Sequence, residues 1–137
     1  MSALATGWNG GQQMFVLDSS ALIELINGGP KATQVQALMG DAPLATTSIS
    51  MHEVLIGARS EKERFVFEGM FSAMSVLAHD ARAALAGSRI DAQLSHQGTK
   101  INFADVLIAG TCAAHHAELV TLDGDFGKIK NVKVHIL

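Results

Sequence analysis

The segment Ile101–His116 (INFADVLIAGTCAAHH) constrains the fold of this chain more than any other. After Asn102 and Phe103 it is an almost unbroken run of small and apolar residues up to the His pair, and its one acidic side chain is Asp105. A helix that is apolar nearly all round belongs in a protein core rather than on its surface. The sequence therefore predicts a buried helix that carries a carboxylate near its beginning.

Three further acidic residues lie just beyond short apolar runs. Asp18 directly follows MFVL, Glu53 lies in the helix expected after LATT, and Asp123 directly follows LVTL. Short, continuous apolar runs suit strands that are buried on both faces. In a parallel sheet, functional groups gather outside the carboxyl ends of the strands. We therefore expect these three acids and Asp105 to converge at one edge of a sheet.

The order of the elements predicts the fold class. Strands that alternate with helices indicate a parallel sheet with helices on both faces, here a three-layer α/β/α domain with about five short strands. At 137 residues the chain is one domain, expected over 14–137, and the Gly-rich segment 1–13 is expected to be an appended tag or tail. The expected strands are 14–17, 44–47, 75–78, 119–122 and 132–137, and the expected helices are 19–27, 31–39, 48–59, 61–74, 80–97 and 101–116.

Composition narrows the class of protein. A hydrophobic fraction of 48% and a charged fraction of 17% describe a folded globule, and a net charge of −3 argues against a broad basic surface for duplex nucleic acid. The single cysteine, Cys112, excludes an internal disulfide and fits a reducing cytoplasm. No apolar run reaches the ~18 residues that a membrane span needs, so we expect no membrane association.

Each acid also has a local explanation. Asp18 could cap the helix that follows it, Ser50 and Glu53 have the spacing of a capping box, and Asp123 begins a turn. Together, however, three carboxylates about 4 Å apart would repel by roughly 12 kcal/mol at an effective dielectric near 20, which is comparable to the stability of a whole domain. A bound divalent cation is the simplest remedy.

The ligand chemistry indicates which cation. A site made of carboxylate oxygens, without Cys or a His pair, favours Mg²⁺ or Mn²⁺ over Zn²⁺. Such a site suits phosphodiester hydrolysis, because the metal polarises the phosphate and lowers the pKa of a bound water. No serine, cysteine or histidine nucleophile is required.

Four stretches then resemble a known family. LDSSALIEL at Leu17–Leu25, SISMHEVLIGA at Ser48–Ala58, NFADVLIAGTC at Asn102–Cys112 and LVTLDGDFGKI at Leu119–Ile129 resemble the successive motifs of PIN-domain ribonucleases, most closely the VapC toxins of toxin–antitoxin pairs. Each motif is weak alone, but the ordered set spans Met14 to Leu137. The resemblance implies a PIN domain over 14–137 that acts as a Mg²⁺-dependent endoribonuclease on RNA.

The resemblance also implies roles for individual residues. Asp18 and Asp105 would be the principal metal ligands, with Glu53 as the third acid. The fourth acid would be Asp123 or Asp125, and we slightly favour Asp123. Small polar neighbours of the site would be Ser19, which could instead be a helix N-cap, and Thr121.

The same resemblance implies two protein partners. One is a cognate VapB-type antitoxin whose C-terminal segment enters the acidic cleft, and the other is a second copy of the chain in a homodimer. The helix expected at 61–74 carries more large apolar residues than one packing face needs, so it could serve the core or a subunit interface. These residues are Phe65, Phe67, Met70, Phe71 and Met74.

Alternatives to the nuclease remain open. The first is a non-catalytic PIN fold that binds RNA or a protein without cutting. A phosphatase that forms an aspartyl-phosphate would need a second Asp two residues after Asp18, where Ser20 stands, and a receiver domain would need an acceptor Asp that LATTS does not supply.

The lack of tyrosine and the single Trp8 argue against base selection by aromatic stacking. Two basic groups are either solvated surface or phosphate contacts, namely Arg59, Lys62 and Arg64, and Lys128, Lys130 and Lys133.

Overall fold

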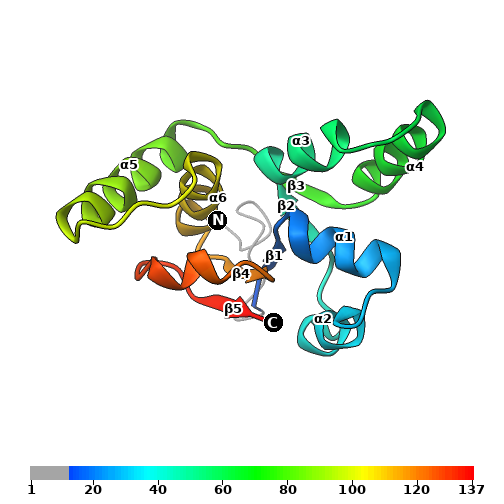
Figure 1. Cartoon of the computed structure of the whole chain (residues 1–137), viewed down its shortest axis with the longest axis horizontal. Helices are drawn as coiled ribbons and strands as arrows, with labels where there is room; N and C mark the ends of the chain where they lie inside the picture. Colours follow the sequence, from blue (N-terminus) through cyan, green and yellow to red (C-terminus); the bar gives the residue numbers. More distant parts are fainter. Residues whose placement is uncertain (1–12) are drawn as a thin grey trace, which may run out of the picture.

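Two small parallel sheets, one of three strands and one of two, lie at the centre of the computed structural model, which describes residues 13–137 (Figure 1). The predicted tag at 1–13 therefore lies outside the described residues, except for Gln13. Strand β4 (Glu118–Thr121) lies between β1 (Phe15–Leu17) and β5 (Val134–Ile136), and β2 (Ala45–Thr47) pairs with β3 (Ser75–Leu77). All pairings are parallel, and Thr46 Oγ1 joins β2 to β1 by donating to the Leu17 carbonyl at 2.7 Å. The expected five-stranded parallel arrangement is confirmed.

Helices connect the strands in the predicted order. None of those that the structure describes is long and apolar enough to cross a lipid bilayer. Their bounds are α1 (Ser19–Asn27), α2 (Ala32–Met39), α3 (Ser48–Ile56), α4 (Glu61–Ser72), α5 (Ala81–His96) and α6 (Phe103–Ala114), followed by the short 3₁₀ helix η2 (Gly124–Lys128).

The strands bury side chains on both faces and so divide the core in two. Val16 and Leu119 pack with residues of α5 and α6, whereas Leu17 and Val120 pack with residues of α1 to α4. Successive side chains on a strand point to opposite faces, so each short strand supplies both cores. Figure 1 shows α5 and α6 on one side of β1 and β4, and α1 and α2 on the other. The three-layer α/β/α prediction is confirmed.

Helix α6 is buried as its sequence predicts. Ile108, Ala109 and Cys112 are at most 1% exposed, and Gly110 lies against the backbone of α5 at Gly87. Burial raises the pKa of the Cys112 thiol to about 12, so this cysteine is an inert packed side chain. The tight contact between α5 and α6 fixes the helix that carries Asp105.

The N-terminal caps differ from the prediction at one helix. Neither Ser48 nor Ser50 caps α3, because the Thr47 hydroxyl accepts a hydrogen bond from the Ser50 amide at 3.0 Å. The capping-box reading of Ser50 and Glu53 was therefore wrong, and Glu53 lies in the second turn of α3. Thr47 is a fully buried strand residue, so its role as a cap depends on where β2 ends, which short-range spacing does not specify.

The Phe- and Met-rich helix serves the core only in part. Phe67 and Phe71 of α4 are buried in the core cluster that also contains residues of α1, α2 and α3, but Phe65 is 77% exposed. Ile56 at the end of α3 and Val66 on α4 are also largely exposed. Packing in the core thus explains Phe67 and Phe71, whereas Phe65 and Val66 of α4 stay exposed to solvent.

Candidate active site

Asp18 is fixed at the point where β1 ends and α1 begins. Its amide donates to the Val120 carbonyl of β4 at 3.1 Å, and its carboxylate caps α1 by accepting from the Ala21 amide at 3.0 Å. The carboxylate also accepts from the hydroxyls of Ser20 and Thr121, each at 2.6 Å. Burial raises the pKa of Asp18, although these hydrogen bonds oppose the rise. Asp18 is therefore the N-cap of α1, as the sequence allowed, and is also almost completely buried.

Two hydroxyl groups tie the ends of β1 and β4 around Asp18. Thr121 Oγ1 accepts from the Asp123 amide at 2.9 Å, and Ser20 Oγ accepts from the Leu122 amide at the same distance. Each hydroxyl donates to the Asp18 carboxylate and accepts a hydrogen bond from a backbone amide just after β4. The sequence predicted Thr121 as a polar neighbour of the site, but the contact of Ser20 with Asp18 was not predicted. The signal was present, since a hydroxyl two residues after an N-cap Asp is placed to bond back to it.

Glu53 reaches the same edge from α3. The hydroxyl of Ser19, the first residue of α1, donates to Glu53 Oε1 at 3.2 Å. Ser19 is not the N-cap of α1, because Asp18 occupies that position. One oxygen of Glu53 is thus oriented by α1, and the side chain remains partly exposed.

Asp105 experiences the charge of every other candidate acid. Burial raises its pKa to about 6, and the rise is increased by repulsion from four carboxylates, in decreasing order Asp123, Glu53, Asp18 and Asp125. Hydrogen bonds link three of these acids independently of charge, because Ser19 next to Asp18 donates to Glu53, and Thr121 joins Asp18 to the Asp123 amide. Since repulsion falls off with distance, its effect on Asp105 is consistent with a position near this group.

The two candidates for the fourth acid differ in their surroundings. Asp123 repels both Asp105 and Asp18, while Asp125 adds the smallest contribution at Asp105. Asp125 is also paired with Lys128 at 3.4 Å on the exposed side of η2. The side chain of Asp123 accepts from the Asp125 amide at 2.9 Å and so begins η2. These contacts favour Asp123.

The donor set fits Mg²⁺ better than it fits a closed metal cage. Among residues 13–137, no three His, Cys, Asp or Glu side chains already form a metal-ligating cluster. Mg²⁺ keeps several waters and uses one or two protein carboxylates directly, so a looser group of acids suits it. A bound cation would relieve the repulsion among these acids. Asp18 and Asp105 are the pair whose pKa values the neighbouring acids raise.

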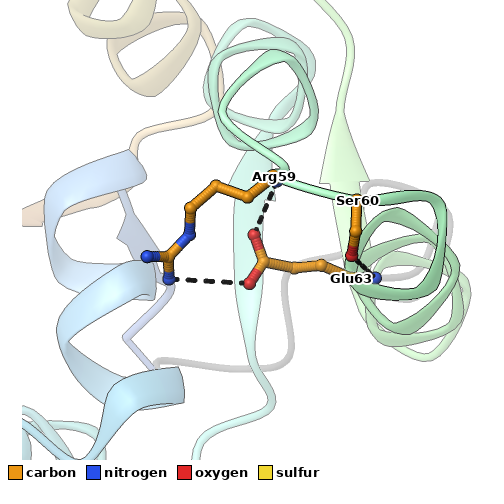
Figure 2. A network of polar contacts seen from close by, with 3 residues as sticks. All are labelled: Arg59, Ser60 and Glu63. Carbon is orange, nitrogen blue, oxygen red and sulfur yellow. Dashed lines mark hydrogen bonds and ion pairs between the residues drawn. The ribbon is translucent and has the colours of Figure 1, made fainter.

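Most of the predicted basic groups are paired with acids of the same chain. Figure 2 shows Arg59 at the α3–α4 turn, where its guanidinium lies 3.7 Å from Glu63 and its amide donates to the same carboxylate. Arg64 pairs with Glu68 and Lys133 with Glu118. The pairs of Arg59 and Arg64 are exposed, worth about 0–1 kcal/mol each, and easily exchanged for other partners, whereas Glu118, the partner of Lys133, is buried. For these residues an acidic partner in the same chain accounts for the charge without requiring a phosphate.

Thr121→Val should destabilise the protein by about 2–3 kcal/mol at neutral pH. Valine keeps the shape of threonine but leaves the Asp18 carboxylate without one of its donors and the Asp123 amide without its acceptor. Urea unfolding measures the change, and Thr33→Val on the exposed face of α2 is the control, expected within ~0.5 kcal/mol of the parent. Equal stabilities of the two variants would mean that the hydroxyl does not hold Asp18.

The fold and the acidic group together define a class of protein, namely α/β/α domains whose functional carboxylates gather beyond the carboxyl ends of parallel strands. The chain belongs to the PIN-domain family, because the family model named PIN domain matches residues 15–132. The resemblance that the four motifs carry is thereby confirmed.

Proteins named VapC are similar to this chain over nearly its whole length. The tRNA(fMet)-specific endonuclease VapC of Salmonella typhimurium is 27% identical over 125 residues, covering 88% of this chain and 95% of that protein. Its counterpart in Shigella flexneri is 29% identical over 111 residues, covering 78% and 84%. The VapC branch that the motifs indicated is therefore the branch in which curated relatives are found.

Solved structures agree with the fold. DNA-bound VapBC from Salmonella typhimurium contains a chain that is 26% identical and superposes with a TM-score of 0.77, covering 90% of this chain and 98% of that one. A chain of VapBC2 from Rickettsia felis, bound to a promoter fragment, superposes with a TM-score of 0.78 at 21% identity, covering 91% and 99%. At that identity the second likeness concerns the fold alone.

Proposed function

We propose that this chain is the ribonuclease toxin of a VapBC-type toxin–antitoxin pair and that it hydrolyses RNA phosphodiester bonds with the help of Mg²⁺. The observation that carries the proposal is the hydrogen-bonded grouping of Asp18, Glu53 and Asp123 through Ser19 and Thr121 in a PIN domain. The similarity to endonucleases along nearly the whole chain supports it.

Asp18 and Asp105 would hold the cation at the sheet edge, and Asp123 would contact it through a bound water. When bound, Mg²⁺ supplies a Lewis acid for the phosphate and lowers the pKa of a coordinated water. Ser20 and Thr121 keep the Asp18 carboxylate in one orientation by donating to both of its oxygens. Because the Ser19 hydroxyl occupies Glu53 Oε1, Glu53 Oε2 is left to accept a proton from the attacking water.

A VapB-type antitoxin is the proposed protein partner, and its C-terminal segment would cover the acidic edge. Structural neighbours of this chain were solved as VapBC complexes, which supports the pairing. A homodimer is proposed as well, because Ile56, Phe65 and Val66 leave an apolar face on α3 and α4 uncovered. Apolar and aromatic residues are enriched in such interfaces.

The test of the activity uses initiator tRNA, the substrate named for both curated relatives. Purified protein should cleave it in the presence of Mg²⁺, lose the activity in EDTA, and recover it when Mg²⁺ is restored in excess. Binding of RNA that is independent of Mg²⁺, without any cleavage, would instead establish the non-catalytic PIN module. Cleavage that persists in EDTA would refute the metal-dependent proposal.

A further inference from the structure

A small cavity lies at the junction of α5, the loop that follows it and the start of α6. Its volume is about 160 Å³, and Leu94 and Val106 form its buried floor. Phe103 also lines it and has 68% of its surface exposed, so the ring stands at the rim. Lys100 lies beside it in the loop. None of these residues takes part in the acidic group described above.

We propose that this cavity binds one nucleobase of the RNA strand near the cut, with Phe103 as the stacking surface and Lys100 facing a neighbouring phosphate. The inference rests on the proposed action on RNA and adds a substrate-positioning subsite to it. An exposed phenylalanine alone is ordinary. Here the ring stands at the rim of a cavity, and a cation lies next to it.

The size of the cavity limits its occupant. A cavity of about 150 Å³ admits benzene, whereas typical small-molecule pockets measure roughly 300–1,000 Å³. A volume of about 160 Å³ therefore suits a planar ring but not a whole nucleoside. The mixture of an apolar floor with polar side chains at the edge, including Ser95 and Thr99, suits a base that has an apolar face and hydrogen-bonding edges.

The position of the cavity relates it to the candidate active site. Phe103 and Val106 are three residues apart and share one side of α6, whereas Asp105 projects from another side of the same first turn. A strand with its scissile phosphate at Asp105 would cross this turn to reach the cavity, over a distance on the order of 10 Å, the diameter of a helix. The bound base would therefore belong to a nucleotide close to the cut.

One cation, Lys100, and one carboxylate, Asp91, line the cavity, and Lys100 is the side chain that would meet a phosphate. Within residues 13–137, Lys100 makes no ion pair, in contrast to Arg59, Arg64 and Lys128. It is exposed, so its ammonium group is available to a phosphate without the loss of an internal contact. The proposed stacking on Phe103 does not require base selection, so it is compatible with the expectation that aromatic residues do not select the base.

The test compares Phe103→Ala with Phe103→Trp and with Leu85→Ala, which truncates an exposed apolar side chain elsewhere on α5. Binding of a short fluorescent single-stranded RNA is measured by anisotropy, and cleavage kinetics are measured on the same RNA. Phe103→Ala should weaken binding by about 5- to 100-fold and raise KM with little change in kcat. Phe103→Trp and Leu85→Ala should resemble the parent.

An abasic scan of the RNA then locates the bound base. At one position near the cut, removing the base should weaken binding to the parent as much as Phe103→Ala does, and the two changes together should not be additive. Unchanged RNA affinity of Phe103→Ala, or an equal effect of that variant on every abasic RNA, would overturn the proposal and leave the cavity to a protein partner. The binding arm does not depend on cleavage, so an inactive parent would contradict the proposed function but not the base site.

Discussion

Asp105→Asn should reduce RNA cleavage by roughly 1,000-fold or more and should at the same time stabilise the metal-free protein. The loss of activity follows from the loss of a proposed metal ligand, because several kcal/mol of transition-state stabilisation correspond to about three powers of ten in rate. The gain in stability follows from the burial of the Asp105 carboxylate and from the repulsion by its acidic neighbours, both of which disfavour its charged form.

The sign of the stability change is set by the pKa of Asp105. Folding raises this pKa from 3.8 to about 6, so the folded protein binds the proton more tightly than the unfolded chain does. The free energy of unfolding of the metal-free protein should therefore fall as the pH rises from about 4 to 6 and stay lower above that. Asp105 is only half buried, so solvent screening reduces the effect to about 1–2 kcal/mol. Asparagine lacks this titration and retains the stability at neutral pH.

Urea unfolding in EDTA at pH 4, 6 and 8 measures the difference in stability between Asp105→Asn and the parent. Titration with Mg²⁺ then measures how far the metal reverses that difference. Saturating Mg²⁺ should stabilise the parent by about 2.7 kcal/mol at 100 times its Kd and should stabilise Asp105→Asn much less. Asp41→Asn, in the exposed turn after α2, removes the same charge elsewhere and is the control. If Asp105→Asn cleaves RNA as well as Asp41→Asn does, Asp105 has no part in the chemistry.

The secondary structure was largely predictable because short, local patterns of apolar residues specify the strands and helices of this fold. Runs such as MFVL and LVTL are apolar because their strands are buried by helices on both faces, and α6 is apolar because it packs on α5 as well as on the sheet. Patterns of this kind are local and do not require knowledge of the partner.

The details of the acidic group were less predictable because they depend on distant residues. Ser20 and Thr121 lie 101 positions apart, yet their hydroxyls meet around Asp18. Ser50 was a candidate cap of α3 because its spacing from Glu53 fitted a capping box, while the buried Thr47 was regarded only as a strand residue. Local spacing offers several chemically equivalent hydroxyls, and tertiary packing selects among them.

Gly110→Ala should destabilise the protein by about 2 kcal/mol or more and lower its Tm by roughly 5–10 °C. A Cβ atom at this position would come within 2.7 Å of the Ala83 carbonyl oxygen and of Gly87 Cα. These are backbone atoms, which do not rotate away, so α5 and α6 would have to separate. Because α6 carries Asp105, the displacement should also reduce RNA cleavage in proportion to the loss of alignment.

Gly87, on the opposite side of the same contact, provides the matched control. A Cβ atom there would lie 3.6 Å from the Val106 carbonyl oxygen and 3.7 Å from Gly110 Cα, which is ordinary van der Waals contact. Gly87→Ala should therefore be neutral or should stabilise α5 by up to about 0.5–1 kcal/mol, since alanine is the better helix former. Thermal unfolding of both variants decides the matter. Equal destabilisation would mean that any side chain in this contact is harmful, whereas unequal destabilisation, with Gly110→Ala the worse, would show that α6 needs a glycine at position 110 to approach the α5 backbone.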